Sequence, residues 1–154
     1  MSDERESNET AGNPGWRLER RVTTPAEHRR LAEAVGWGDG FDWSSLPASL
    51  DASLFGVVAL AGEDVIGMGR LVGDGVKYFY VQDVAVDPAW QGRGVGQAIV
   101  EALLAWVGTV APSTAFVGLF ATEAAMPLYR RNGFGTEGLK GMARLIDPAG
   151  DQRP

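Results

Sequence analysis

Apolar residues recur at every second position in several short stretches of the chain, a pattern typical of half-buried β-strands. Residues 16–22 (WRLERRV) alternate in this way, and three longer apolar stretches follow at residues 54–62, 65–73 and 76–86. Short turns rich in glycine and acidic residues separate the last three stretches. The pattern therefore predicts a first strand near the N-terminus and three later strands joined as antiparallel hairpins.

A helix is predicted directly after the first strand. Thr24 and Glu27 have the spacing of a capping box, Pro25 occupies the first helical position, and Gly36 ends the pattern. His28 falls in the first turns of this helix beside two arginines, and it is predicted to be exposed to solvent. The chain beyond Gly36 is predicted to be irregular, with a short helix near its end.

The spacing of apolar residues predicts a second long helix over residues 94–107. Its buried face is formed by Val95, Ile99, Leu103 and Val107. Residues 114–121 (TAFVGLFA) form a short apolar run, which predicts a strand that is buried on both faces. Strands and helices in this order indicate a mixed α/β sheet with helices on both faces.

The last predicted helix is capped by Thr122 and ended by Gly133. Pro127 lies inside it, and proline clashes with the preceding helical turn, so a kink or a late start near Ala125 is expected. A final pair of strands is expected to continue to about Ile146. These elements predict one domain over residues 16–147, flanked by tails at residues 1–15, predicted to be disordered, and 148–154.

Composition and charge narrow the function. The chain has 154 residues, of which 45% are hydrophobic, enough for one domain with a real core. It contains no cysteine and one histidine, so thiolate metal sites and multi-histidine clusters are excluded, and no metal is expected. The net charge of −6 argues against a nucleic-acid partner. No apolar run reaches the roughly 20 residues of a membrane span, so a cytoplasmic protein without membrane attachment is expected.

A cluster of glycines at the start of the long helix is the main candidate for ligand chemistry. The segment DPAWQGRGVG links a strand to that helix, and such a junction directs several backbone N–H groups outward. It lacks the Gly-Lys-Ser/Thr of a P-loop, and the dinucleotide pattern G-x-G-x-x-G fails because position 97 is Gln and position 99 is Ile. Gln91, Gly94 and Gly96 do satisfy the pattern [Q/R]-x-x-G-x-[G/A].

That pattern resembles the pyrophosphate loop of the GCN5-related N-acetyltransferase (GNAT) superfamily. The preceding strand YVQDVAV and the later segment AAMPLYRRNGF are similar to that family's central strand and last helix, so the resemblance covers about residues 16–146. It implies a mixed, mostly antiparallel sheet of about six to seven strands and acetyl-CoA as cofactor. The coenzyme's pantetheine arm would lie along a strand at Val84, Ala85 and Val86, beside a bulge where the fourth and fifth strands splay apart. Its pyrophosphate would be bound by Gln91, Gly92, Arg93, Gly94, Val95 and Gly96.

The resemblance also assigns catalytic candidates. Tyr129 matches the family's general acid, which protonates the departing thiolate. Thr122 stands where the family often has an asparagine that contacts the pantetheine arm, although it could simply be a helix cap. Asp83 is the only carboxylate inside the central strand; it could bind an ammonium group, accept its proton, or pair structurally with Arg70. Gln82 stands where glucosamine-phosphate acetyltransferases have a glutamate, and strand alternation predicts that it points to the face opposite Asp83.

Aromatic residues hint at the acceptor. Trp37, Phe41 and Trp43 lie close together in the irregular segment, where they either cover the core edge or line a cleft with Tyr78 and Tyr80. The expected reaction is transfer of acetyl to a primary amine of a small molecule, with a homodimer as one expected assembly. Acetylation of protein N-termini or lysines and a non-catalytic acyl-CoA-binding module are the alternatives, and an ATP- or NAD-binding protein is disfavoured by the failed motifs.

Overall fold

The computed structural model describes residues 14–39 and 41–148. The chain divides into two compact units, one ending at Leu119 and one beginning at Phe120, and each is described by itself. The tails predicted at 1–15 and 148–154 lie outside the described residues apart from positions 14, 15 and 148.

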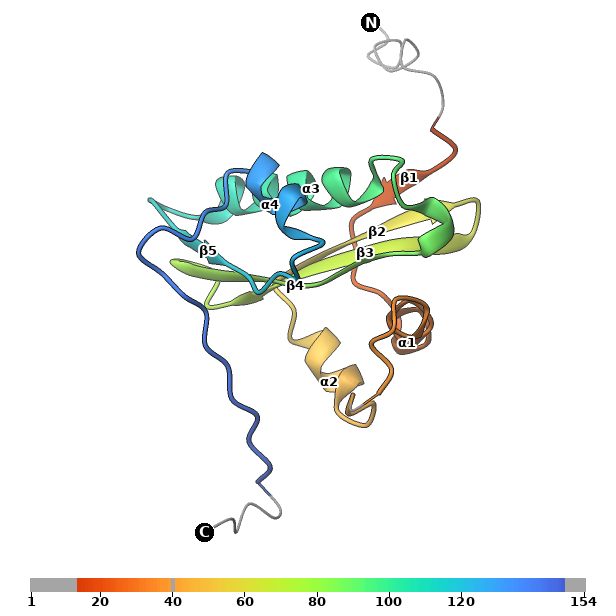
Figure 1. The fold of residues 1–154 in the computed structure, drawn as a ribbon, viewed down its shortest axis with the longest axis horizontal. Coiled ribbons are helices and arrows are strands. Elements are labelled where there is room, and N and C mark those ends of the chain that lie inside the picture. Colours follow the sequence, from red (N-terminus) through yellow and green to blue (C-terminus); the bar gives the residue numbers. More distant parts are fainter. Residues whose placement is uncertain (1–13, 40, 149–154) are drawn as a thin grey trace, which may run out of the picture. The chain divides into compact units, whose positions relative to one another are not determined.

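The first unit is built on a five-stranded sheet in the order of the sequence (Figure 1). Its strands are β1 (Arg17–Glu19), β2 (Phe55–Ala61), β3 (Asp64–Gly73), β4 (Tyr78–Val86) and β5 (Phe116–Gly118). Neighbouring strands are antiparallel except for the parallel pair β4 and β5. The predicted hairpins and the mixed, mostly antiparallel sheet are therefore confirmed, with five strands instead of the predicted six to seven.

Strand β5 differs from its prediction. It pairs only with β4 and forms an edge of the sheet, and Phe116 is 40% exposed. The prediction that it is buried on both faces was therefore wrong, because an apolar run alone does not distinguish an edge strand from a central one.

Helices cover both faces of this sheet. Figure 1 shows α3 (Val95–Val110) on one face, and α1 (Pro25–Ala34) and α2 (Leu46–Asp51) on the other. The predicted apolar face of α3 is confirmed, since Val95, Ile99, Leu103 and Val107 are buried. Between β4 and α3 lies a short 3-10 turn, Pro88–Trp90. No helix in the described ranges is long and apolar enough to cross a membrane.

Two glycines of β3 let α3 approach the sheet closely. A Cβ atom on Gly69 would lie 2.7 Å from Cγ2 of Ile99, and one on Gly67 would lie 2.9 Å from Cγ1 of Val95. Both distances are shorter than real Cβ contacts, so any side chain at these positions would push the helix outward. The opposite face has its own buried cluster, composed of Leu31, Val58, Leu60, Val65, Met68 and Ala85.

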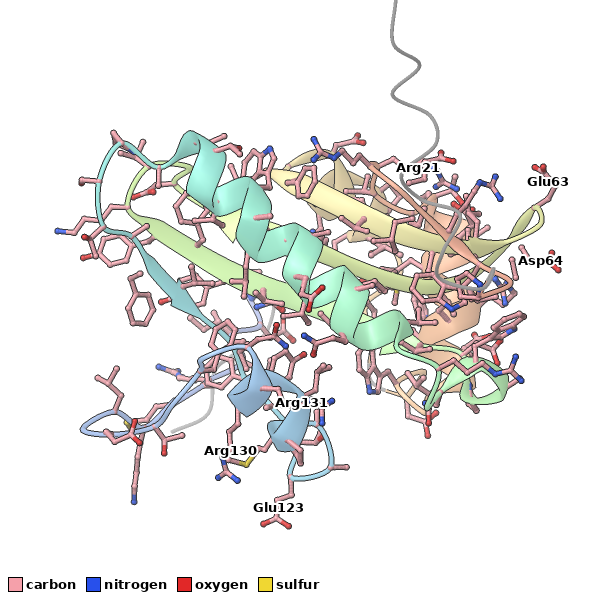
Figure 2. All side chains as sticks on the ribbon, turned by 90° about the horizontal axis from the view of Figure 1, so that it is seen from above. Arg21, Glu63, Asp64, Glu123, Arg130 and Arg131 are labelled. Atoms are coloured by element: carbon pink, nitrogen blue, oxygen red, sulfur yellow. The ribbon has the colours of Figure 1, made fainter. Side chains whose placement is uncertain are left out.

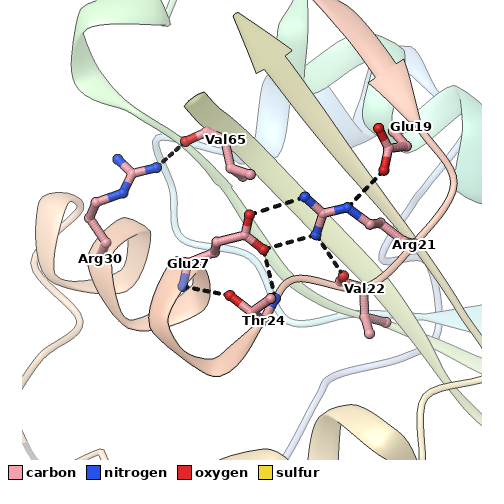
Figure 3. Close-up of polar contacts among 7 residues, drawn as sticks. All are labelled: Glu19, Arg21, Val22, Thr24, Glu27, Arg30 and Val65. Atoms are coloured by element: carbon pink, nitrogen blue, oxygen red, sulfur yellow. Dashed lines mark hydrogen bonds and ion pairs between the residues drawn. The ribbon is translucent and has the colours of Figure 1, made fainter. Parts of the chain in front are cut away.

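Helix α1 begins with the predicted capping box (Figure 3). The backbone N–H of Glu27 donates to Oγ1 of Thr24 at 3.2 Å, and the N–H of Thr24 donates to Oε1 of Glu27 at 2.8 Å. Arg21 clamps the same carboxylate through both terminal nitrogens, and Arg30 donates to the carbonyl of Val65. The helix is thus fixed at its start to the chain that leaves β1.

Replacing Glu27 by glutamine is expected to cost about 1 kcal/mol at neutral pH, because it removes an ion pair that is partly screened by solvent. Hydrogen bonding from Arg21 lowers the pKa of Glu27 to about 2. A lowered folded-state pKa gives stability that is present above the unfolded value and is lost as the pH falls through the folded one. Denaturant unfolding should therefore show the gap between the two proteins narrowing from about pH 5 downward.

The exposed turn residue Glu63, labelled in Figure 2, supplies the control for this measurement. Glu63→Gln removes the same charge without breaking an ion pair, so its free energy of unfolding should follow that of the wild type over the whole range. A gap for Glu27→Gln that stays constant between neutral and acidic pH would contradict the assigned role of the ion pair.

The second unit contains α4 (Met126–Arg131), which begins directly after Ala125 and so confirms the predicted late start. Gly133 has φ of +86° and ends the helix, as predicted. Figure 2 shows Arg130 and Arg131 on the last turn of α4, where their positive charges interact favourably with the negative end of the helix dipole.

The predicted strand pair after Gly133 was wrong, because residues 135–148 contain no strand. Their apolar side chains do not alternate between a covered and an exposed face. Met142 is 90% exposed, Leu145 is 96% exposed and Ile146 is 72% exposed. Apolar composition therefore suggested strands where the described chain has no pairing partner for them.

Candidate active site

A bulge in β4 organises the polar centre of the first unit. Met68 is opposite Ala85 and Arg70 is opposite Gln82, so two residues of β4 face the single residue Gly69. Asp83 takes up the extra length with φ of +56°, and it is the only non-glycine residue with positive φ in the described ranges. The bulge implied by the family resemblance is therefore present, with an aspartate in a backbone region that normally favours glycine.

The bulge also changes which side chains share a face. Residues directly opposite one another on neighbouring strands point to the same side of a sheet, so Gln82 lies on the face of Arg70. Asp83 contacts Arg70 and therefore lies on that face too. The prediction that Gln82 and Asp83 point to opposite faces was wrong, because strict alternation fails at an inserted residue.

Asp83 is held between two nitrogen groups. Nε of Arg70 donates to Oδ2 of Asp83 at 2.8 Å, which confirms the predicted pairing with Arg70. Nε2 of His28 lies 3.1 Å from the same oxygen. The rest of the Arg70 guanidinium is anchored to α2 and the residues just after it, through the hydroxyl and carbonyl of Ser49 and the hydroxyl of Ser53.

His28 is buried, with 1% of its surface exposed, so the prediction of an exposed histidine was wrong. It precedes Leu31 and Ala32 by three and four residues, and these spacings put all three on one face of α1. The ring of Phe41 lies 5.6 Å from the imidazole and the ring of Trp43 lies 6.4 Å from it. The helical spacing was the signal that could have found this residue, and the two neighbouring arginines obscured it.

The charge state of Asp83 follows from these contacts. Burial alone would raise the pKa of Asp83, but the contacts with His28 and Arg70 outweigh it and hold the pKa below its usual value. The carboxylate therefore stays ionised at neutral pH. An ionised, poorly basic carboxylate is better suited to binding a cation than to keeping a proton taken from one.

The strands separate beyond this centre. Strand β5 pairs with β4 only from Tyr78 to Tyr80, and in the described chain no strand pairs with that side of β4 beyond Tyr80. The predicted splay is therefore present. The segment Val84–Val86, predicted to hold the pantetheine arm, pairs with β3 on one side and has no pairing strand on its β5 side. An extended ligand can hydrogen-bond to the backbone on that open side as an additional strand.

The glycine loop follows at the end of β4. Gly92 has φ of +77° and Gly94 has φ of +81°, and an added Cβ would meet no atom within 4 Å at either position. Gly94 is the N-cap of α3, whose first N–H groups have no partner within the helix. The side-chain amide of Gln91 donates to the carbonyl of Val86 at 3.0 Å and so ties the loop to the strand. Open space above helix-terminal amides fits a diphosphate.

The remaining candidates are placed as follows. The guanidinium of Arg93 lies 4.7 Å from the centre of the Trp90 ring. Trp37 packs against the cluster around Leu31, a placement that favours the core-edge alternative for this residue. Phe41 and Trp43 stack on each other at 4.6 Å next to His28. Tyr80 is 38% exposed and shares the face of Arg70 through its register opposite Val72.

Two candidates belong to the second unit. Oγ1 of Thr122 accepts from the N–H of Ala125 at 3.3 Å in the turn before α4, and the N-cap of α4 is Ala125, so the prediction that Thr122 caps this helix was wrong. Tyr129 is buried, and its ring meets Phe134 edge-on at 5.8 Å. Burial raises the pKa of Tyr129, so the phenol keeps its proton at neutral pH and above.

Comparison with known families decides what this arrangement is. The family model for the acetyltransferase (GNAT) domain matches residues 52–136, which include β2, β3, β4, the glycine loop and Tyr129. The chain belongs to this family. A probable acetyltransferase from meticillin-resistant Staphylococcus aureus has a similar structure, with a TM-score of 0.77, 26% identity, and coverage of 86% of this chain and 98% of that one.

Curated relatives include plant acetyltransferases. Histone acetyltransferase TAP1 of Glycine max is 33% identical over 73% of this chain and 53% of its own length. Serotonin N-acetyltransferase 2 of Oryza sativa, a chloroplastic protein, is 35% identical over 51% of this chain and 39% of its own length. The chain thus spans about half or less of the length of these two relatives.

Proposed function

We propose that this GNAT protein is an acetyl-CoA-dependent N-acetyltransferase that transfers acetyl to a primary amine of a small molecule by direct attack in a ternary complex. The observation that carries the proposal is the end of β4, which has no pairing strand on its β5 side beyond Tyr80. A short turn and the glycine loop link it to the N-terminus of α3, which Gly94 caps. An extended thioester arm and a diphosphate need these two features side by side.

Acetyl-CoA supplies the acetyl group as a thioester. The backbone of Val84–Val86 is proposed to hold its pantetheine arm, and the N–H groups from Gly92 to Gly96 its pyrophosphate. Both glycines with positive φ leave the amides uncovered by side chains. Arg93 adds positive charge beside the loop, and its stacking on Trp90 keeps the guanidinium there.

The acceptor is proposed to bind at Asp83. Both contacts of this carboxylate fall on Oδ2, and no other described residue donates to Oδ1. That oxygen can take the ammonium group of the acceptor, whose proton then leaves through Asp83 or through water. Tyr129 is proposed to give its phenolic proton to the departing sulfur, since burial keeps the phenol protonated.

A small amine is favoured over a protein acceptor by the aromatic pair Phe41 and Trp43, which lies beside His28, the residue that contacts this carboxylate. The relative named as a serotonin N-acetyltransferase supports an arylalkylamine, whereas the relative named as a histone acetyltransferase supports the protein alternative. A non-catalytic acyl-CoA-binding module remains the candidate from another class. A cytoplasmic location and a homodimer are part of the proposal.

Thiol release from acetyl-CoA, measured over a panel of arylalkylamines, polyamines and lysine peptides, tests the function. Turnover with at least one small amine is the expected result. Thermal stabilisation by acetyl-CoA without turnover on any amine would identify a binding module, and preference for peptides would identify a protein acetyltransferase.

Replacing Gly94 by alanine is expected to weaken acetyl-CoA binding about tenfold or more, because its Cβ would stand in front of the helix-terminal amides. Isothermal titration calorimetry measures the effect. Gly62→Ala is the matched control, since Gly62 also has positive φ and open space around its Cβ but lies in the turn between β2 and β3. Both variants pay the same kind of backbone strain, about 1 kcal/mol. Equal affinity in the two would contradict the proposed loop.

A further inference from the structure

The buried imidazole of His28 has no role in the chemistry described so far. It is the only histidine of the chain, it is 1% exposed, and the rings of Phe41 and Trp43 lie beside it. Burying a polar ring without a partner is costly, so a buried histidine in contact with a candidate substrate-binding carboxylate calls for a reason.

We propose that His28 is a positioning residue for the acceptor: its Nε2–H holds Oδ2 of Asp83, so that Oδ1 is presented to the acceptor's ammonium group. The inference rests on the proposed function. It assigns to α1 a part in substrate recognition, and it specifies the acceptor as a cation whose charge is read by one oxygen of a fixed carboxylate.

Geometry supports this division of the carboxylate. Nε2 of His28 lies 3.1 Å from Oδ2, and the ring nitrogens have no well-aligned hydrogen bond in the described part of the chain. The contact is therefore close but imperfectly directed, as catalytic hydrogen bonds often are before substrate binds. Nε of Arg70 donates to the same oxygen, and Arg70 is itself fixed by Ser49 and Ser53.

Charge supports the same assignment. With a neutral imidazole, the group formed by Arg70, Asp83 and His28 has no net charge. The terminal nitrogens of Arg70 already donate hydrogen bonds to Ser49 of α2. A second cation can then approach Oδ1 without meeting an unpaired positive group. Asp83 sits on a bulge with positive φ, where the side chain needs an external support to keep one orientation.

His28 acts through Asp83 and does not touch the acceptor. The imidazole is 1% exposed, and the small cavity against His28, Arg70 and Asp83 measures about 10 Å³, room for at most one water molecule. The acceptor's amine therefore cannot enter this cavity to reach the imidazole.

Because the chain has a single histidine, a long-range ¹H–¹⁵N spectrum reads its tautomer without assignment. The expected result at mildly alkaline pH is a proton on Nε2 in the wild type, and a loss of that preference in Asp83→Asn. Phenethylammonium should shift the imidazole signals of the wild type, whereas the uncharged 2-phenylethanol should not. A proton on Nδ1 in the wild type, or an imidazole that ignores phenethylammonium, would overturn the inference even if the enzyme acetylates amines.

Kinetics on an accepted amine give a second test. His28→Gln keeps an N–H donor near the position of Nε2, and His28→Leu removes it. The leucine variant is expected to raise KM for the amine about tenfold with little change in kcat, while the glutamine variant stays within about twofold of wild type, and both bind acetyl-CoA normally. Equal losses in both variants, tracking their thermal stability, would show a merely structural histidine. Absence of turnover on every amine, with the spectroscopic result intact, would instead reject the proposed function alone.

Discussion

Replacing Asp83 by asparagine is expected to lower kcat/KM for amine acceptors by about a hundredfold or more, the scale of losing one charged partner of a buried ion pair. The substitution keeps the shape of the side chain and removes its charge. Asparagine also tolerates positive φ better than other residues, so the bulge at φ of +56° can persist. Steady-state kinetics at saturating acetyl-CoA measure the loss, which should appear mainly in the terms for the amine.

The matched control is Asp64→Asn. Asp64 is the exposed first residue of β3 (Figure 2), so removing its charge should leave kcat/KM unchanged. Asp83→Asn also leaves Arg70 without its carboxylate, which destabilises a partly buried pair. Acetyl-CoA affinity measured by calorimetry separates the loss of acceptor binding from a loss of stability. An unchanged affinity shows that the site is folded. Retention of full activity in a folded Asp83→Asn protein would reject Asp83 as the acceptor-binding group.

The sequence predicted the parts of the fold whose signals are local. Apolar runs between glycine-rich turns predict the strands β2, β3 and β4, and the capping box of Thr24 and Glu27 predicts α1. The glycine loop was found for the same reason, since positive φ at Gly92 and Gly94 demands a residue type that is visible in the sequence.

The features that were missed depend on pairing between distant residues. The position of the bulge is set by the register of β3 against β4, and no short stretch of sequence contains this information. The bulge places Gln82 on the same face as Asp83, whereas strand alternation predicted opposite faces. His28 lies on an apolar face of α1, but the charged residues next to it in sequence suggested exposure. The missing strand pair after Gly133 shows the converse error, because β-propensity without a partner strand does not make a strand.

Tyr129 illustrates how a local motif can fix a functional side chain. After α4 the N–H of Phe134 donates to the carbonyl of Tyr129 at 3.1 Å, and the N–H of Gly133 donates to the carbonyl of Arg130 at 3.1 Å. These two bonds, with positive φ at Gly133, form a Schellman motif. The apolar contact that usually accompanies the motif is here the edge-on packing of Phe134 against Tyr129. The Tyr-x-x-x-Gly-Phe spacing noticed in the sequence therefore has a physical basis.

Tyr129→Phe is expected to lower kcat by about a hundredfold while KM for acetyl-CoA and the melting temperature change little, because the ring and its packing on Phe134 remain. The raised pKa of Tyr129 also predicts the pH dependence of the rate. Burial raises the pKa of Tyr129 above the ordinary phenol value of about 10, so the phenol stays protonated beyond that pH. The wild-type rate should therefore fall only as the pH rises through the raised pKa. Tyr78→Phe, at a 47% exposed position of β4, removes a hydroxyl of the same kind and should leave the rate unchanged. A Tyr129→Phe protein with wild-type kcat would show that the departing thiolate obtains its proton elsewhere.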